Sequence, residues 1–341
     1  MLKIQFIGKL FYIINIVVAL LLLIAYGLPY LQPSSFPTLS ILSIVVSPLI
    51  VLNIIFAVYW VLNFRKRFWL SFTVLIVGYL FSNSLFEISS EGNSEAFPKQ
   101  LKILSYNVRL FNAYEKDNNA KQVSESFSRL LQNQNPDVIC IQEYYADHQV
   151  DFSAYPYRFV YFKGKNKLGH AIFSKYPLVN TGSFDFKNTY NNTIYSDLVV
   201  KGDTLRLYNI HLQSLGILPS VDFLQQRGTE RIKKRLSQSF VQQEKQVAEI
   251  LQHQAENKYP TILTGDFNNT AYSYIYKNLK QDLQDAFQQR GNGLGTTFYF
   301  NGYPLRIDFS LLSETFEIIA FDNVKESFSD HYPIVTHLGW E

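Results

Sequence analysis

The first 86 residues of the chain contain no aspartate and no glutamate, and this absence divides the sequence into two parts. The only basic residues in that segment are Lys3, Lys9, Arg65, Lys66 and Arg67. All 28 acidic residues lie after position 86, together with 26 of the 31 lysines and arginines. The second part is therefore close to neutral. Since domains that bind nucleic acid tightly are usually basic, this charge balance disfavours tight nucleic-acid binding.

Cysteine is almost absent as well. Cys140 is the only one, so no disulfide can form within the chain. A domain of about 250 residues buries enough apolar surface to fold without such crosslinks. There is also no cysteine cluster and no H-E-x-x-H pattern, which argues against a structural zinc site or a zinc peptidase.

Three apolar runs occupy the acid-free part, at about 10–31, 39–63 and 68–86. Each is near the ~20 residues that a helix needs to cross a bilayer. A cleaved signal peptide is an alternative for the first run, but two more runs follow it. Buried helices of a soluble protein are a weaker alternative, because the runs have no polar face. Residues 1–86 are therefore predicted to form a transmembrane region of three helices.

The positions of lysine and arginine predict the orientation of these helices. Lys3 and Lys9 precede the first run, a basic cluster at 65–67 separates the second and third, and the loop 29–38 has no charge. Cytoplasmic loops carry the excess of basic residues, so the amino terminus is expected in the cytoplasm. Three crossings then place the rest of the chain outside it, after a flexible polar linker at 87–100.

From residue 101 the pattern changes to short β-rich runs separated by polar loops. Residues 120–134 and most of 223–256 have helical periodicity. Many strands with few helices indicate sheet packed on sheet, with helices outside. The expected strands lie at 101–106, 138–141, 158–162, 169–174, 178–185, 194–200, 204–211, 260–264, 306–312, 316–320 and 333–338.

Polar side chains follow several of these strands where core packing does not require them. They are Asn107, Glu143, His211, Asp266, Asn268, Asp308, Asp330 and His331. Each alone has a structural explanation: Gly-Asp and Ser-Asp are common in turns, and Asp308 could pair with Arg306. Together, four carboxylates, two histidines and two asparagines favour hydrolysis with a hard cation. Oxygen ligands of this kind suit Mg²⁺ or Mn²⁺.

The motifs that contain these residues resemble the endonuclease/exonuclease/phosphatase superfamily, which includes pancreatic-type deoxyribonucleases and neutral sphingomyelinases. The most specific strings are Gly-Asp-Phe-Asn at 265–268 and Ser-Asp-His-Tyr-Pro-Ile at 329–334. The strings Ile-Gln-Glu, Asn-x-His-Leu and Arg-x-Asp-Phe occur in the same order as in the family. The resemblance covers 101–341. It implies an α/β four-layer sandwich in which helices flank two mixed β-sheets.

The resemblance also implies a metal site. Glu143 would be the main ligand, with Asn107 beside it and Asp330 close enough to contribute. The cofactor would be Mg²⁺ or Mn²⁺, in contact with a phosphate oxygen of the substrate. The resemblance fits a site with one metal ion and a site with two equally well.

The other roles follow from the same resemblance. Asp266 would position or deprotonate the attacking water, and Asn268 would hold the scissile phosphate. His331, oriented by Asp308, would contact the phosphate. His211 would stabilise the transition state or protonate the leaving oxygen. The sequence leaves open which of these groups is the general acid and which the base.

The segment 213–240 carries two weaker signals. Its apolar first half could enter a bilayer, cover an apolar substrate or pack on the domain. The basic residues within 227–235 fit a phosphate-facing patch or a solvated helix face equally well.

Three functions are compared. A phosphodiesterase that acts on a lipid headgroup or a small phosphodiester near the membrane fits the anchor and the neutral domain. A membrane-anchored nuclease for DNA or RNA is the alternative, although tracking a nucleic-acid backbone needs several basic contacts. An inactive binding module is disfavoured by the complete set of polar residues. No obligate protein partner is expected.

Overall fold

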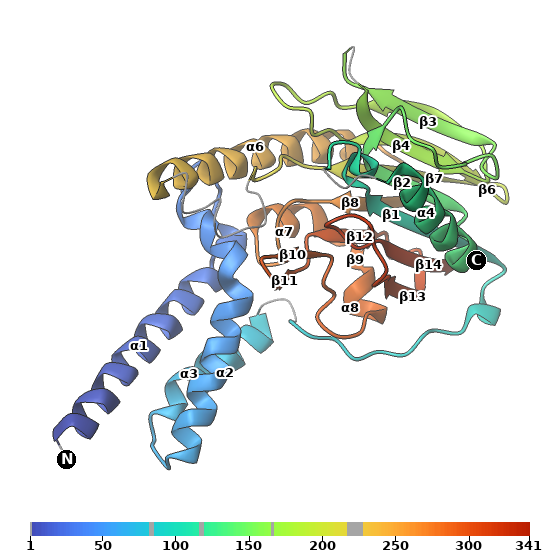
Figure 1. Cartoon of the computed structure of the whole chain (residues 1–341). Coiled ribbons are helices and arrows are strands. Elements are labelled where there is room, and N and C mark those ends of the chain that lie inside the picture. The colour runs from blue at the N-terminus through green and yellow to red at the C-terminus, as the bar shows by residue number, and fades with distance from the viewer. Residues whose placement is uncertain (1, 82–84, 116–118, 165–166, 217–227) are drawn as a thin grey trace.

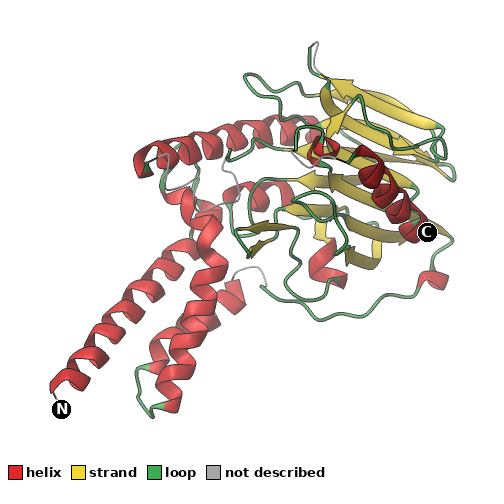
Figure 2. Ribbon diagram, in the orientation of Figure 1, coloured by secondary structure: helices red, strands yellow, loops and turns green. Residues whose placement is uncertain are grey.

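The computed structural model describes residues 2–81, 85–115, 119–164, 167–216 and 228–341. It has a helical arm at the amino terminus and a sheet domain at the carboxyl end of the arm (Figures 1 and 2). The helices are α1 Leu2–Tyr26, η1 Leu28–Tyr30, η2 Leu39–Val45, α2 Val46–Leu62, α3 Phe68–Phe81, η3 Ser94–Ala96, η4 Arg109–Asn112, α4 Ala120–Gln134, α6 Thr229–Ala255, α7 Tyr274–Lys280 and α8 Ala286–Arg290.

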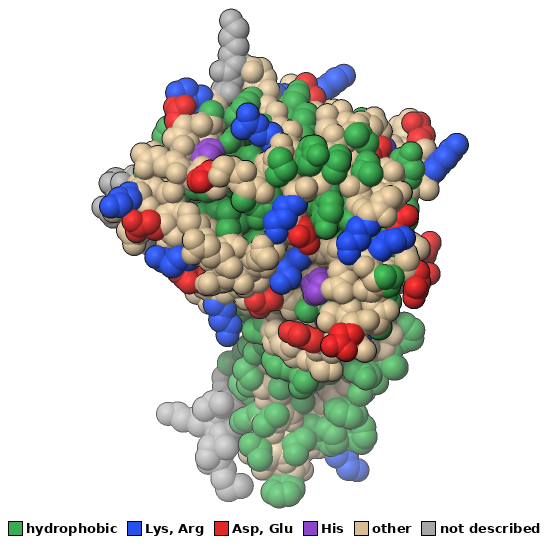
Figure 3. Space-filling view, turned by 90° about the vertical axis from the view of Figure 1, so that its right-hand side faces the viewer, with side chains coloured by type: hydrophobic (Ala, Val, Ile, Leu, Met, Phe, Trp, Pro, Cys, Tyr) green, Lys and Arg blue, Asp and Glu red, His purple; other side chains and the backbone are tan. Residues whose placement is uncertain are grey.

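Three apolar helices, α1, α2 and α3, form the arm. They pack through one shared cluster that includes Leu22 of α1 and Phe56 of α2. Asn15 is buried at their interface, where it donates to Ser71 Oγ over 2.6 Å and accepts from Trp60 Nε1 over 2.9 Å. Most of the remaining apolar side chains face outward, and Figure 3 shows them covering the lower part of the molecule.

Two helical stretches within the described residues are long and apolar enough to cross a membrane, Gly8–Tyr30 and Leu39–Leu62. Only 22% and 28% of their apolar windows are buried, so they differ from the core helices of a soluble protein. The third predicted span differs from expectation. Helix α3 has 14 residues, or about 21 Å of rise, and a bilayer core is ~30 Å thick. Residues 82–84 of that predicted span lie outside the described part.

The described part of the domain contains two six-stranded mixed sheets and one small hairpin. The first sheet has the order β13-β14-β1-β2-β4-β3, and the second β5-β6-β7-β8-β12-β9. In each sheet one central pair is parallel, β1 with β2 and β7 with β8. The strands are β1 Lys99–Asn107, β2 Val138–Tyr145, β3 Tyr157–Phe162, β4 Leu168–Ser174, β5 Leu178–Ser183, β6 Ile194–Val200, β7 Asp203–His211, β8 Thr261–Asp266, β9 Gln284–Asp285, β10 Phe298–Phe300, β11 Tyr303–Leu305, β12 Asp308–Leu312, β13 Glu317–Asn323 and β14 Ile334–Trp340.

Three apolar clusters hold the domain together in layers. One lies between the sheets and joins Ile103 and Cys140 of the first to Leu207 of the second. A second packs α4 against the outer face of the first sheet, and a third packs α6 and α7 against the outer face of the second. Two mixed sheets flanked by helices are thus observed, as predicted.

Short elements after residue 266 differ most from the sequence-based expectation. Helices α7 and α8 and strands β9, β10 and β11 were not predicted. The segment 87–100, expected as a flexible linker, is hydrogen-bonded to the domain. Glu87 pairs with Gly293 through two backbone hydrogen bonds of 2.9 Å, and Gly92 N–H donates to Ile319 O. Strand β1 also begins at Lys99, inside the expected linker.

Candidate active site

The residues predicted from strand ends come together where the two sheets meet. Asn107 ends β1 and Glu143 lies near the end of β2, its parallel neighbour. His211 and Asp266 end the parallel pair β7 and β8 and are directly paired. Parallel neighbours finish at the same edge of a sheet, so each pair brings two polar side chains to one place. Asn107 Nδ2 donates to Asp266 Oδ2 over 3.0 Å and so joins the two sheets.

Antiparallel strands supply the remaining residues. Asp308 begins β12 and is paired with Asp266 at the end of β8. Asp330 and His331 lie in the loop before β14, which runs antiparallel to β1. The amino ends of β12 and β14 therefore reach the edge where β8 and β1 finish. All eight predicted positions converge there, although their chemical roles remain predictions.

Two backbone features aim the carboxylates. Gly265 has φ of +138°, and a Cβ atom at this position would lie 2.0 Å from Ile210 O. Only glycine permits this approach of β7 to β8. Glu143 has φ of +53° and lies at a shift in the register between β2 and β4. A bulge of this kind redirects a side chain out of the ladder, and a non-glycine residue at positive φ is a strain typical of functional sites.

Asp266 is the centre of the hydrogen-bond network. Its side chain is buried and accepts from the Asn268 backbone N–H over 2.7 Å and from Asn268 Nδ2 over 3.1 Å. The Nε2 atoms of His211 and His331 each lie 3.7 Å from Asp266 Oδ2. Burial raises the pKa of Asp266, and the positive charge of His331 opposes that effect. A group in this position can exchange protons near neutral pH.

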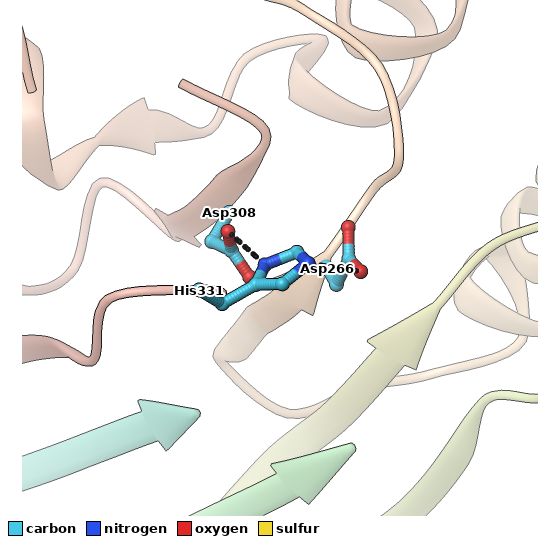
Figure 4. Close-up of side chains that lie close together, drawn as sticks. All are labelled: Asp266, Asp308 and His331. Carbon is cyan, nitrogen blue, oxygen red and sulfur yellow. Dashed lines mark hydrogen bonds and ion pairs between the residues drawn. The ribbon is translucent and has the colours of Figure 1, made fainter. Parts of the chain in front are cut away.

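Asp308 pairs with His331 and not with Arg306. Asp308 Oδ2 lies 2.9 Å from His331 Nδ1, and Figure 4 shows the imidazole between Asp308 and Asp266. Arg306 instead binds Asp285, with Nη1 and Oδ2 2.7 Å apart. The structural alternative for Asp308 is therefore wrong. Burial alone lowers the pKa of His331, but Asp308 and Asp266 outweigh it and raise the pKa to about 10.

His211 is in the opposite protonation state. Burial, and then the charges of His170 and His331, keep the pKa of His211 well below its usual value. At neutral pH His331 is a cation and His211 is uncharged. One histidine can therefore donate a proton or stabilise negative charge, whereas the other can accept a proton or a hydrogen bond.

Two side chains within hydrogen-bonding distance of His211 were not identified as site residues from the sequence. His170 Nε2 lies 3.2 Å from His211 Nδ1, and Asn191 Nδ2 lies 2.7 Å from His211 Nε2. His170 is a buried residue of β4. No sequence signal marks Asn191, because it lies in the loop between β5 and β6 that only folding brings to His211.

The carboxylates are close enough to favour a cation. Asp266, Asp308 and His331 present atoms that could hold a metal ion, all within 4.8 Å of one another, and this set differs from the predicted ligands Asn107, Glu143 and Asp330. Asn107 Nδ2 also lies 3.4 Å from Glu143 Oε1. Burial raises the pKa of Glu143, and the charge of His331 and the hydrogen bond from Asn107 oppose that effect only in part. The grouped carboxylate oxygens fit a hard divalent cation.

A cleft of about 840 Å³ opens over these residues and reaches the helical arm. Its lining includes Arg109, whose Nη1 lies 3.6 Å from Asp330 Oδ2. The segment 213–240 contributes to the lining in part, since Leu215 and Arg235 also line the cleft. Residues 217–227 of that segment lie outside the described residues.

Comparisons with known proteins agree with this geometry. The model of the endonuclease/exonuclease/phosphatase family matches residues 104–331, and a domain family of unknown function matches residues 8–85. No curated protein matches the chain.

Solved structures share the fold at low sequence identity. An endonuclease/exonuclease/phosphatase from Bacteroides vulgatus is 14% identical with a TM-score of 0.53, covering 71% of this chain and 99% of that one. A humanized D. rerio TDP2 is 19% identical with a TM-score of 0.52, covering 70% and 99%. The human Nocturnin catalytic domain with bound sulfate is 17% identical with a TM-score of 0.50, covering 71% and 94%. Because the family model spans more than half of the sequence, the chain belongs to the endonuclease/exonuclease/phosphatase family of metal-dependent phosphoester hydrolases.

Proposed function

We propose that this protein is a membrane-anchored phosphodiesterase that uses Mg²⁺ or Mn²⁺ and acts on a lipid headgroup or a small phosphodiester at the membrane surface. The observation that carries the proposal is the position of the site, because one cleft is lined both by Asp266 and His331 and by residues of the helical arm. Substrate turnover then takes place where the domain meets the apolar helices.

Separate residues are proposed to bind the cation, to activate the attacking water and to hold the phosphate. Glu143, Asn107 and Asp330 would hold the cation, which neutralises charge on a phosphate oxygen when bound. Asp266 orients the attacking water and accepts its proton. The His331 cation binds a phosphate oxygen, with its ring held by Asp308 through the 2.9 Å hydrogen bond. Asn268 holds the phosphate, and neutral His211 stabilises the transition state.

Removal of the divalent cation is expected to abolish hydrolysis. Full-length protein would be assayed with Mg²⁺ or Mn²⁺ and with chelator on sphingomyelin, glycerophospholipids, plasmid DNA, RNA and bis(4-nitrophenyl) phosphate. Calorimetric titration with Mn²⁺ provides a second measurement, in which Glu143→Ala should weaken binding by about tenfold to a hundredfold. Activity that survives in chelator, or a Glu143→Ala variant with native Mn²⁺ affinity, would contradict the metal assignment.

A nuclease is the second candidate, and one observation favours it. A D. rerio TDP2 with 17% identity and a TM-score of 0.52 has been solved with a single-strand DNA product. The salt dependence of activity separates the two functions. Contacts with several nucleic-acid phosphates make binding fall steeply with salt, whereas hydrolysis of a lipid or a small diester should change little. Nicking of plasmid DNA with steep salt dependence, without lipid hydrolysis, would favour the nuclease.

The orientation of the protein is also a proposal. The basic residues at 65–67 favour a cytoplasmic position of the α2–α3 turn. The domain lies outside the cytoplasm only if the segment that contains α3 also crosses, since an even number of crossings leaves it on the side of the amino terminus. Protease added outside intact cells should digest the domain. Protection of the domain in intact cells, with digestion after lysis, would refute this orientation.

A further inference from the structure

One wall of the cleft comes from the helical arm and another from a hairpin of the domain. Both walls are apolar, although Asp266 and His331 line the same cleft. The residues that form these walls are Ile41, Ile44 and Val45 of η2, which runs directly into α2 of the arm, and Phe298, Phe300 and Leu305 of the β10–β11 hairpin.

The arm wall is fixed to the loop that carries Asn268. Ser43 is buried, and its Oγ donates to Asn269 Oδ1 over 3.3 Å. Thr270 Oγ1 donates to Ser43 O over 2.7 Å. Gln243 of α6 completes the connection, because its Nε2 donates to Asn268 O over 3.1 Å and its Oε1 accepts from Asn269 Nδ2 over 2.8 Å. The neighbours of Ser43 in the wall are therefore held at a set position relative to the candidate active site.

The hairpin wall is joined to the other side of the site. Phe298 forms a β-bridge with His331, and their ring centroids lie 5.0 Å apart. Thr297, which directly precedes the hairpin, is hydrogen-bonded to two segments of the site. Its Oγ1 accepts from Asp308 N–H, and its backbone O accepts from Tyr332 N–H. The apolar surface thus begins directly beside the imidazole that is proposed to bind phosphate.

We infer that the cleft holds one acyl chain of a phospholipid between the arm and the β10–β11 hairpin, with the lipid phosphate against His331 and Asn268. This inference rests on the proposed function and names its substrate class. Arg109 and Arg235 are the only cationic Lys or Arg side chains among the described lining residues. They suit one phosphodiester, whereas a polyanion needs a longer row of basic contacts.

The exposed side chains of the arm give a lipid an apolar surface along which to approach the cleft. Val45 lies in the cleft and is 38% exposed. Further along α2, the side chains of Val51 and Ile55 are exposed on the part of the arm that is proposed to lie in the bilayer. An acyl chain that moves from the bilayer into the cleft therefore stays in contact with apolar side chains, and only its headgroup reaches the polar residues.

Chain length is the variable that tests this inference. The full-length protein, held in an amphipathic polymer without lipid, would be given monomeric phosphatidylcholines and phosphatidylethanolamines with butanoyl or heptanoyl chains. Each buried methylene favours binding by about fourfold, so kcat/KM should be much higher for the heptanoyl lipids. In the double variant Ile41→Ala/Ile44→Ala, the heptanoyl-to-butanoyl ratio of kcat/KM should fall about tenfold.

Two further variants make the result decisive. Ile13→Ala/Ile14→Ala removes the same atoms from two exposed side chains of α1 outside the cleft lining, so it should keep the native ratio. Val45→Trp fills part of the cleft and should also lower the heptanoyl-to-butanoyl ratio of kcat/KM. This variant keeps the inference testable if the double variant does not fold.

The outcomes separate the inference from the proposed function. If the unmodified protein hydrolyses lipid with metal but its heptanoyl-to-butanoyl ratio of kcat/KM is near one, the inference is overturned and the proposed phosphodiesterase activity stands. Absence of metal-dependent hydrolysis of every lipid and of bis(4-nitrophenyl) phosphate overturns the proposed function itself. Cleavage of DNA or RNA alone overturns both.

Discussion

Asp266→Asn is expected to lower kcat by about a thousandfold or more while the protein remains folded, because positioned proton transfer contributes about 10²–10⁴-fold. The substitution keeps the shape of the side chain but removes its negative charge. Asp266 accepts from Asn107 Nδ2 and twice from Asn268, so an amide in its place would turn a donor toward other donors. The measurement is single-turnover hydrolysis at saturating metal, with circular dichroism to confirm the fold.

The matched control for this variant is Asp282→Asn, which makes the same chemical change at an exposed position between α7 and β9. It should retain native turnover. If Asp266→Asn hydrolysed substrate at a rate close to that of Asp282→Asn, Asp266 would not be the residue that accepts the proton of the attacking water. This conclusion would hold whether or not the metal assignment is correct.

Asp308→Asn is expected to lower kcat by about a hundredfold or more at neutral pH and to change the shape of the pH profile. The Asp308 carboxylate is the first of the charges that raise the pKa of His331 to about 10. With Asp308 present, His331 stays protonated as the pH rises, until the pH reaches about 10. Without it, the proton leaves at lower pH, so the alkaline limb of kcat against pH should move to lower pH.

A double-mutant cycle separates the pair from a general loss of structure. His331→Ala alone should lower kcat at least as much as Asp308→Asn, and the double variant should resemble His331→Ala, because Asp308 acts through the imidazole. Additive effects would show that Asp308 acts elsewhere in the site. An Asp308→Asn profile with an unshifted alkaline limb would show that His331 is not the group that titrates there.

Local patterns predicted the long, regular elements of the fold well. Helix α4 has the predicted bounds 120–134, since Asn119 caps its first turn, Val123, Phe127 and Leu130 share one buried face, and Asn135 ends it in the left-handed conformation. The short elements after β8 were not predicted. Helix α8 has five residues and β9 has two, which is too short for a hydrophobic period to be recognised. Their positions depend on packing against β12 and β13.

In the arm, too, local sequence patterns predicted some features, and others depend on tertiary contacts. Length and hydrophobicity identified Gly8–Tyr30 and Leu39–Leu62, because those two properties are local. The described part of α3 reaches Phe81, whereas the predicted span extends to residue 86. The contact of Ser43 with Asn269 joins residues 226 positions apart. No periodicity in the sequence indicates a contact of that separation.

The sequence by itself determined the reaction class, because the Gly-Asp-Phe-Asn and Ser-Asp-His-Tyr-Pro-Ile strings identify chemistry that needs those residues in that order. Tertiary structure alone decided how the groups act on one another. The same residue type, histidine, is a cation at 331 and neutral at 211, because folding places Asp308 beside the first and buries the second away from water. Folding also made the arm a wall of the cleft. Burial and charge depend on neighbours in space, and the order of residues along the chain does not specify those neighbours.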